Sequence, residues 1–277
     1  MRISFVQPRA ELRPYIESLW VLESSVGMPR MGQSMAAPNG CPKLIIPYEN
    51  SITSIADGRV QVSREQGVYF VGNRDTSTSI QTSSRKTGFI AIEFCPFGAY
   101  AFWGIPMDES ANHLLASDEI FGQWGREIRE VLCNIEKVEE KVEFIQEQLV
   151  VRLGQSQQSQ RSTTLVEFCI GTLKHSDGRM PIHELERKTG FSRRYLGSLF
   201  RQQVGFPPKT MAEIFRFQRF YRRWARTQTF EQVRDEMYEY YYDQAHFTKE
   251  FKRMTGYSPR RFTHEVSNEF GRRLLLK

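Results

Sequence analysis

Two short segments near the carboxyl end of the chain place cationic and polar side chains on one face of a predicted helix. In the first segment, residues 193–204, apolar residues follow the 3–4 spacing of a buried helical stripe. These are Tyr195, Leu196, Leu199, Phe200 and Val204. The opposite face carries Arg193, Arg194, Gly197, Ser198, Arg201 and Gln202. Arginine can bond the edge of guanine through two N–H groups, and a glycine lets a helix approach the bases closely. This face therefore predicts hydrogen bonding to double-stranded DNA.

A second segment, residues 244–254, predicts the same chemistry with a milder set of side chains. Phe247, Phe251 and Met254 are expected to face inward. The outward face carries Gln244, Ala245, Thr248, Lys249 and Lys252. Glutamine can pair with adenine, alanine or threonine can contact a thymine methyl group, and lysine more often holds a phosphate. His246 is expected to be half-buried and not to read a base.

The candidate DNA contacts form two sets. The base-reading candidates are Arg193, Arg194, Gly197, Ser198, Gln244, Ala245, Thr248 and Lys249. The phosphate candidates are Arg201, Lys209, Lys252, Arg260 and Arg261. The alternative for each segment is an ordinary surface helix with solvated charges. We expect the first segment to contribute most of the base specificity.

The elements that must position these side chains are two copies of one helical unit. Residues 195–208 reappear as residues 246–259 at a constant offset of 51 residues. Before the first copy, Pro181 begins a helix at Ile182, Gly190 permits a tight turn, and Ser192 can cap the next helix. Asp243 can cap the corresponding helix of the second copy. A helix, a short turn and a second helix with a polar outer face is the helix-turn-helix plan.

Charge is unevenly distributed between the two halves of the 277-residue chain. Residues 1–161 hold 16 Lys and Arg against 19 Asp and Glu, whereas residues 162–277 hold 22 against 13. The second half therefore has a balance of +9 and the first a balance of −3. This asymmetry indicates that only the second half meets a polyanion, although a solvated basic surface would look the same.

The chain divides at a polar segment, residues 154–161, which is expected to be a linker between residues 1–153 and residues 162–277. Before it, short segments between residues 43 and 94 predict strands. They are 43–48, 51–56, 60–63, 68–72, 78–81 and 88–94. Helices are predicted over 97–103, 117–133 and 136–153. The expected class is α+β, with an N-terminal β-rich, barrel-like domain and an all-α second domain.

The second half resembles the AraC/XylS family of bacterial transcription regulators over about residues 165–266. The motifs behind the resemblance are Ile182-x-x-Leu185, Gly190-Phe191-Ser192-x-x-Tyr195-Leu196-x-x-Leu199-Phe200, Gly205-x-Pro207-Pro208, Arg216-Phe217, Tyr242-Asp243-Gln244-Ala245-His246-Phe247, Phe251-Lys252 and Gly256-Tyr257-Ser258-Pro259. The resemblance implies two helix-turn-helix units joined by a long helix, here about 208–226. It also implies that helices 193–204 and 244–254 enter successive major grooves, about 34 Å apart.

The second unit departs from the family pattern. Its turn, which ends at Tyr238–Asp243, is three residues longer than the first turn and lacks the usual glycine. Phe230 and Val233 match Ile182 and Leu185 in spacing, while Glu186 and Arg234 stand where family members often carry alanine. The second reading helix is therefore expected to add affinity and a weaker preference.

The first half resembles the ligand-sensing domains of AraC-type proteins, which are often cupin-like. Its motifs Pro14-Tyr15-Ile16-x-x-Leu19-Trp20, Pro38-Asn39-Gly40 and Phe94-Cys95-Pro96-x-Gly98-Ala99 also resemble a divergent N-terminal domain of some such regulators. Trp20, Tyr48, Phe70, Glu93 and Phe94 are candidates for a ligand pocket, and plain core is the alternative. An unidentified small-molecule effector is one partner to test.

No catalytic, metal or cofactor site is expected. None of the five histidines falls in the β-region, which argues against a metal-dependent cupin enzyme. The four cysteines form no CxxC pair, and Cys41 and Cys95 are expected to be buried thiols that act as small apolar residues. The alternative is an enzyme acting on DNA or a small molecule, with the helical half as a targeting module. Such an enzyme would need a reactive thiol, with Cys41 and Cys95 the candidates.

The segment Glu136–Leu153 has apolar residues at 4-3-4 spacing: Val138, Val142, Ile145 and Leu149. It predicts either a homodimer seam or a helix that packs on its own β-domain. The amino terminus lacks the apolar core of a signal peptide, and no apolar run is long enough to span a membrane. The sequence thus predicts a cytoplasmic, DNA-binding transcription regulator without enzymatic activity.

Overall fold

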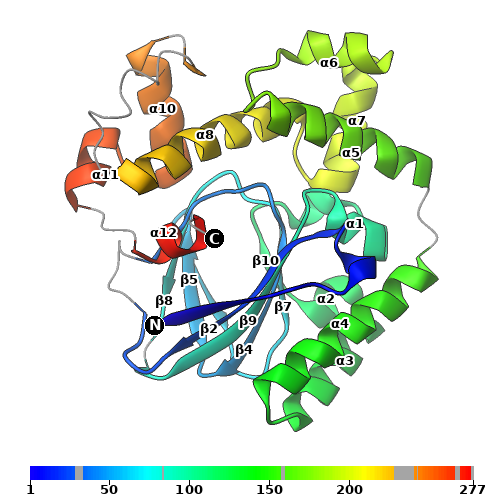
Figure 1. Cartoon of the computed structure of the whole chain (residues 1–277), viewed down its shortest axis with the longest axis vertical. Helices are drawn as coiled ribbons and strands as arrows, with labels where there is room; N and C mark the ends of the chain where they lie inside the picture. Colours follow the sequence, from blue (N-terminus) through cyan, green and yellow to red (C-terminus); the bar gives the residue numbers. More distant parts are fainter. Residues whose placement is uncertain are drawn as a thin grey trace.

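The computed structural model describes residues 1–28, 34–82, 84–156, 160–227, 240–241, 243–265 and 269–275. A β-rich domain and its helices are followed by a helical domain that lies over the end of the sheets (Figure 1). This arrangement confirms the expected α+β class.

The β-rich domain contains two antiparallel sheets. The larger has the strand order β1 (Arg2–Val6), β2 (Ile16–Ser24), β9 (Thr87–Phe94), β4 (Lys43–Glu49), β7 (Tyr69–Val71) and β10 (Leu114–Ala116). The smaller has the order β3 (Met35–Ala36), β8 (Thr78–Gln81), β5 (Ile52–Ala56) and β6 (Arg59–Ser63). The strands expected between residues 43 and 94 are confirmed. Strands β1, β2, β3 and β10 were not predicted. Strand β2 pairs with β9 in the larger sheet, with Leu19 opposite Ile92.

Strand β9 is buried on both faces, and this divides the domain into two cores. Ile90 and Ile92 pack toward the helices on the outer face of the larger sheet. Phe89 and Ala91 face the other way and pack with Ile52 of the smaller sheet. A strand covered on both sides loses the polar alternation of a surface strand. The continuous apolar run of β9 follows from this position.

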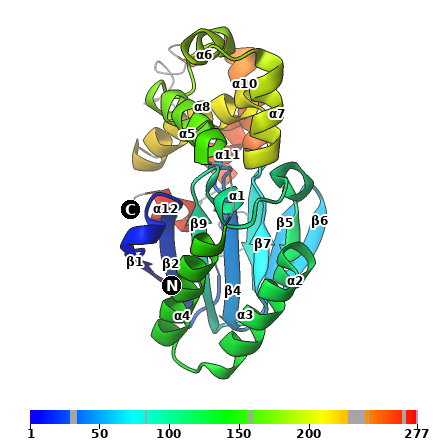
Figure 2. The same ribbon diagram turned by 90° about the vertical axis from the view of Figure 1, so that its right-hand side faces the viewer.

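Helices cover the outer face of the larger sheet (Figure 2). They are α1 (Gly98–Trp103), α2 (Ser117–Phe121), α3 (Gln123–Asn134) and α4 (Val138–Gln155). The single helix predicted over residues 117–133 is wrong, because Gly122 has φ +58° and separates α2 from α3.

Helix α4 packs on its own domain. Val142, Ile145 and Leu149 are 6%, 0% and 0% exposed and belong to the core between the helices and the larger sheet. Of the two predictions for this helix, the structure therefore bears out intrachain packing. A homodimer formed through the Val138–Leu149 seam would have to unpack this core.

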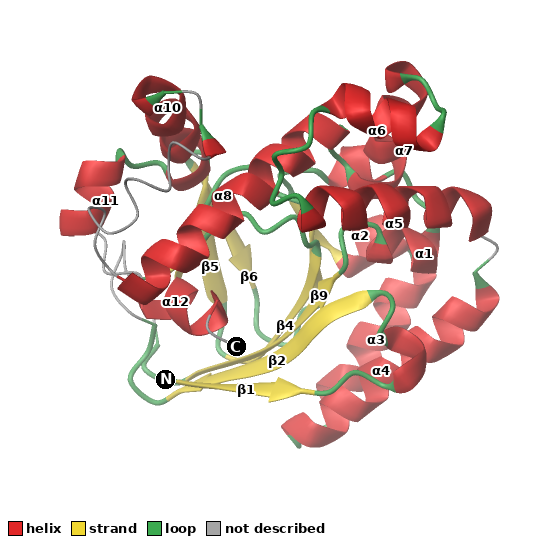
Figure 3. Ribbon diagram, turned by 45° about the horizontal axis from the view of Figure 1, so that its top comes forward, coloured by secondary structure: helices red, strands yellow, loops and turns green. Residues whose placement is uncertain are grey.

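The helical domain contains α5 (Gln160–His175), α6 (Ile182–Thr189), α7 (Arg193–Val204), α8 (Pro208–Thr227), α10 (Gln244–Thr255) and α11 (Pro259–Glu265). Helix α8 confirms the long helix expected over about 208–226 and lies between α7 and α10 (Figure 3). Helices α4 and α5 extend into the predicted linker from both sides. Phe230, Val233, Arg234, Tyr238 and Tyr242 lie outside the described residues.

The two halves are joined by packing as well as by the chain. Met35 and Phe97 of the β-rich domain belong to the same apolar core as α5, α7 and α8. Helix α12 (Glu269–Leu275) returns to the β-rich domain, where Phe270 is 0% exposed and its ring lies 6.4 Å from that of Trp20. Within the described part of the chain, no helix is both long and apolar enough to cross a membrane.

Candidate DNA-binding surface and interdomain cavity

The first helix-turn-helix unit has the predicted local geometry. Gly190 ends α6 with φ +73°, a backbone conformation that favours glycine. The Ser192 hydroxyl accepts a hydrogen bond from the Tyr195 N–H at 3.3 Å and so caps α7. The Glu186 carboxylate accepts a second bond, from the Arg193 N–H at 2.5 Å. Glu186 therefore supports the amino end of α7, where a negative charge is favourable.

The face of α7 that was predicted to read DNA is open to solvent. Arg193, Arg194, Ser198, Arg201 and Gln202 are exposed, and Gly197 is partly exposed. Leu196, Phe200 and Val204 are at most 1% exposed and fix this helix in the domain. Tyr195 was expected to be buried, which is wrong: its side chain is 45% exposed and stacks on exposed Phe191 at 4.9 Å. The turn of the chain at Gly190 places both rings outside the core.

Protein packing leaves room for a side chain at Gly197. A Cβ atom built there would have as its nearest neighbour the Arg201 guanidinium, at 4.0 Å. The position is within a helix with ordinary backbone angles, where glycine costs about 1 kcal/mol relative to alanine. The absence of a side chain at Gly197 would let an external surface, such as DNA, approach α7 closely.

Helix α10, the second helix predicted to read DNA, is also capped and anchored as predicted. The Asp243 carboxylate accepts a hydrogen bond from the His246 N–H at 2.7 Å. Phe247, Phe251 and Met254 are at most 2% exposed. The outward residues Gln244, Ala245, Lys249 and Lys252 are exposed, and Thr248 is partly exposed. His246 is about half-exposed, with 47% of its side chain accessible.

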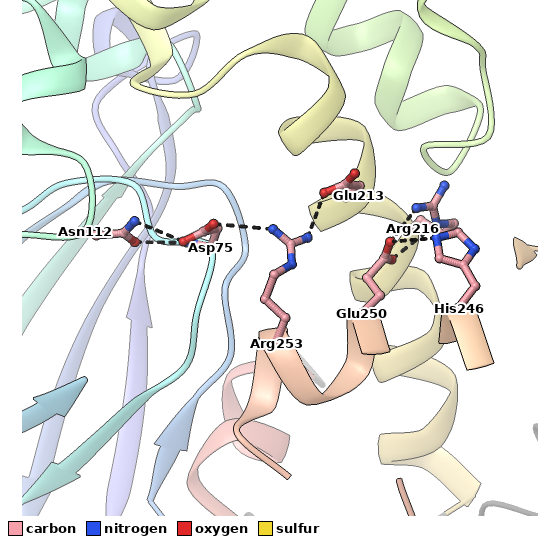
Figure 4. A network of polar contacts seen from close by, with 7 residues as sticks. All are labelled: Asp75, Asn112, Glu213, Arg216, His246, Glu250 and Arg253. Carbon is pink, nitrogen blue, oxygen red and sulfur yellow. Dashed lines mark hydrogen bonds and ion pairs between the residues drawn. The ribbon is translucent and has the colours of Figure 1, made fainter. Parts of the chain in front are cut away.

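A buried ion pair attaches α10 to the long helix α8 (Figure 4). The Arg216 guanidinium donates two hydrogen bonds to the Glu250 carboxylate, at 2.6 and 3.3 Å. The two side chains are only 15% and 5% exposed. Arg216 also lies over the ring of Tyr241 at 5.0 Å. Burial is the main reason that the pKa of Tyr241 is raised. The sequence motif Arg216-Phe217 marked the position of Arg216, but nothing in the sequence indicated that Glu250 would be its partner.

The phosphate candidates all lie at the surface. Arg201, Lys209, Lys252, Arg260 and Arg261 are exposed. They belong to α7 and α10 themselves and to α8 and α11, the helices that follow each of them. Exposed cations on neighbouring helices can meet phosphates on both sides of a groove.

The five residues proposed as a ligand pocket do not form one site. Trp20 packs between the two sheets, whereas Phe70 and Phe94 belong to the core beneath the helices. Tyr48 packs at the edge of that second core. The prediction is wrong because alternate residues of a strand point to opposite faces, which spacing alone could not assign. Of these five residues, Glu93 lines the cavity between the two halves.

That cavity lies between the two halves and has a volume of about 450 Å³. From the β-rich domain it is lined by Glu17, Asn39, Cys41, Lys43 and Glu93, among others. From the helical domain it is lined by Lys174, Asp177, Gln218, Arg219, Arg222 and Arg226. Gly271 and Leu274 of α12 complete the wall. Its shape therefore depends on how the two halves are docked.

Cations outnumber acids in the cavity wall. Three of them face acids: Lys43 lies 3.6 Å from Glu93, Lys174 lies 2.8 Å from Glu17, and Arg219 lies 3.7 Å from Asp177. In the part of the chain that the structure describes, neither Arg222 nor Arg226 has an acid within 4.0 Å.

Buried polar atoms also line this cavity. Glu93 is 3% exposed and accepts a hydrogen bond from the Ser18 hydroxyl at 2.6 Å. Gln218 is 4% exposed, and its amide nitrogen donates to the Pro38 carbonyl at 2.5 Å. The amide oxygen of Gln218 has no protein partner among the described residues. Burying a hydrogen-bond acceptor without a partner destabilises the folded state. A ligand that donates a hydrogen bond to this oxygen would remove that cost.

Three of the four cysteines have the properties of inert thiols, whereas Cys133 is exposed. Cys41 and Cys169 are buried, and Cys95 is partly buried. Burial raises the pKa of Cys41 to about 12 and the pKa values of Cys95 and Cys169 to about 11. Less than about 0.1% of each is thiolate at pH 7.5, and the thiolate is the reactive form.

We therefore expect the folded protein to react with one equivalent of a thiol reagent at pH 7.5, at the exposed Cys133. The Cys133→Ser variant should react with none until it is unfolded. Rapid modification of Cys41 or Cys95 would contradict this and favour an enzyme.

Because folding raises the pKa values of the buried thiols, the free energy of unfolding should also fall as pH rises above about 8.5, where the thiols of the unfolded chain ionise.

A capped helix-turn-helix with an exposed cationic face, a long connecting helix and a second capped reading helix define a DNA-binding protein. Residues 185–265 match the family described as "Helix-turn-helix domain". Residues 4–116 match the family described as "Domain of unknown function (DUF6597)". Residues 185–265 are therefore an AraC-type helix-turn-helix domain, of the kind that binds DNA.

Solved structures with a similar arrangement include ToxT from Vibrio cholerae, with 11% identity over 91% of this chain and 100% of that chain, and a TM-score of 0.49. The AraC-like transcriptional activator CuxR has 15% identity over 80% and 86% of the two chains, with a TM-score of 0.27. Protein NMB1881 from Neisseria meningitidis has 13% identity over 34% and 84%, with a TM-score of 0.26. A search among curated protein sequences finds no match.

Proposed function

We propose that this regulator reads a specific DNA site with two helices, α7 and α10, placed in successive major grooves. The observation that supports the proposal is the contrast between the two faces of each helix. On α7, Leu196 and Phe200 are fully buried while Arg194 and Ser198 are exposed. On α10, Phe247 is fully buried while Gln244 and Lys249 are exposed. Both helices have their carboxyl ends toward the β-rich domain, so their amino ends are free to enter the grooves (Figures 1 and 2).

Selection of bound duplexes from a random pool tests this proposal. We expect a consensus with two conserved blocks separated by about one helical turn, the stronger block corresponding to α7. A consensus limited to one block would show that α10 contributes affinity without base reading. Recovery of no consensus would contradict sequence-specific reading.

Lys252 is expected to contact a phosphate. Lys252→Ala should weaken binding of all duplex sequences to a similar extent and reduce the slope of log K against log salt by about 1. The measurement is a salt titration of binding to a selected site and to an unrelated duplex. A loss confined to the selected site would instead identify Lys252 as a base reader.

We further propose that a small anionic effector binds in the interdomain cavity. Arg222 and Arg226, which have no acid partner among the described residues, would attract a carboxylate or phosphate. The amide oxygen of Gln218, also without a partner there, would accept a hydrogen bond from a hydroxyl group. Both arginines belong to α8, the helix that connects the two reading units. A ligand held between this helix and the β-rich domain would change DNA affinity, and DNA would change ligand affinity by the same factor.

Citrate and inorganic phosphate are suitable probes of this cavity. At a concentration of about 100 times its Kd, a bound anion adds about 2.7 kcal/mol to stability, which raises the unfolding temperature by a few degrees. The shift should be lost in Arg222→Gln/Arg226→Gln and retained in Arg223→Gln, a neighbour on α8 that does not line the cavity. An equal shift in all three proteins would place the anion elsewhere.

A further inference from the structure

The β-rich domain touches the carboxyl ends of both reading helices through one loop. This loop, residues 73–77, lies between strands β7 and β8 on the side of the sheets that faces the helical domain. Different side chains of the loop contact the two helices: Asn73 contacts α7, and Asp75 and Ser77 contact α10.

The first end of the loop holds α7. Asn73 is 2% exposed, and its amide donates a hydrogen bond to the carbonyl of Val204, the last residue of α7, at 2.7 Å. The last carbonyls of a helix have no partner within the helix, so this bond satisfies one of them. Next to it, a Cβ atom at Gly205 would lie 2.9 Å from the Met107 carbonyl oxygen. The carboxyl end of α7 is therefore fitted closely to the β-rich domain.

The other end of the loop holds α10. The Ser77 hydroxyl donates to the carbonyl of Thr255, the last residue of α10, at 3.1 Å. The Arg253 guanidinium, in the last turn of α10, lies 3.4 Å from the Asp75 carboxylate and 2.7 Å from the Glu213 carboxylate of α8 (Figure 4).

The loop itself is braced. The Asn112 side chain donates to the Asp75 carboxylate at 3.0 Å, and it accepts a bond from the Asp75 N–H at 3.2 Å (Figure 4). These two hydrogen bonds fix the orientation of the Asp75 carboxylate, which therefore contacts Arg253 of α10 from a defined position.

These contacts limit the distance between the two reading helices. From Asn73 to Ser77 the chain takes four steps from one Cα atom to the next, which span at most about 14 Å when extended. A side chain and a hydrogen bond add only a few Å at each end. The carboxyl ends of α7 and α10 are therefore held closer than the rise of one turn of DNA, about 34 Å. We propose that the loop 73–77 sets the separation of the two reading helices and thereby the spacing of the two blocks of DNA that the protein accepts. This inference rests on the proposed reading of DNA by both helices.

The separation can be tested without DNA. Spin labels at Gln202→Cys on α7 and Lys249→Cys on α10, both exposed positions, can be introduced with the exposed thiol removed by Cys133→Ser. We expect a single narrow distance distribution, and a distribution at least twice as wide after Asp75→Ala/Ser77→Ala. The Glu109→Ala variant, which removes an exposed acid of the same domain, should leave it narrow. Asn73 is left intact because it is buried. An unchanged width in the double variant would overturn the proposal.

Binding then tests the consequence for DNA. On the selected duplex, insertion of two base pairs between the two blocks should weaken wild-type binding at least tenfold and the Asp75→Ala/Ser77→Ala variant less than threefold. Affinity for a single block should be the same for both proteins. Identical spacing profiles would overturn the role of the loop while leaving sequence-specific reading intact. Equal binding of all sequences would instead contradict the proposed function.

Discussion

Arg216→Met is expected to destabilise the helical domain by about 3–5 kcal/mol, because the buried Glu250 carboxylate loses both guanidinium hydrogen bonds and, among the described residues, keeps only His246, 3.8 Å away, as a cationic neighbour. Glu250 is 5% exposed, so water cannot replace the two hydrogen bonds that it loses. Since this pair joins α8 to α10, the second reading helix should detach first. Urea unfolding followed by circular dichroism measures the loss of stability.

Two variants separate the effect of the unpaired charge from a general effect of mutation. Arg216→Met/Glu250→Gln should recover most of the lost stability, because it removes the buried charge. Arg219→Met, on the same helix, breaks an ion pair whose arginine is 50% exposed and should cost at most about 1 kcal/mol. If Arg216→Met cost no more than Arg219→Met, the buried pair would not anchor α10.

Arg194→Ala is expected to weaken binding to the selected site by about 1–3 kcal/mol, a factor of about 5–150 in Kd, and to relax the preference at one base pair. The reason is that an arginine in the major groove forms two hydrogen bonds with guanine that no other base pair can replace. Arg194 is exposed near the amino end of α7, so its removal should not change the unfolding transition.

Binding isotherms on the selected duplex and on single-base variants measure both effects. Arg126→Ala, which removes an exposed arginine from α3 of the β-rich domain, provides the control and should bind as the wild type does. Unchanged binding by Arg194→Ala would show that α7 does not lie in the major groove in the proposed way.

The local structure of the helical domain was predictable because its signals are local. A helix cap needs a residue such as Ser192 or Asp243 beside the helix that it caps, and a turn needs Gly190 where φ is positive. The 3–4 spacing of apolar residues then assigns the buried face of each helix. Tyr195 was misjudged because it is at the end of this stripe, where the neighbouring helix no longer covers it.

The β-rich domain was less predictable, because the face of a strand has no local signal when both faces are covered. Phe94 and Glu93 are adjacent, but one packs beneath the helices and the other lines the interdomain cavity. Strand β2 was not predicted although it is an inner strand of the larger sheet, since its apolar run lacks the alternation of a surface strand.

The helix-turn-helix class, the two capped helices α7 and α10 and the residues on their outer faces could all be predicted from the sequence. Tertiary packing brings Arg216 to Glu250, places Arg222 and Arg226 at a cavity, and lets one loop contact both α7 and α10. The physical reason is separation along the chain. Caps and helical faces depend on residues within a few positions, whereas Asn73 and Val204 are 131 residues apart and meet only when the two halves dock.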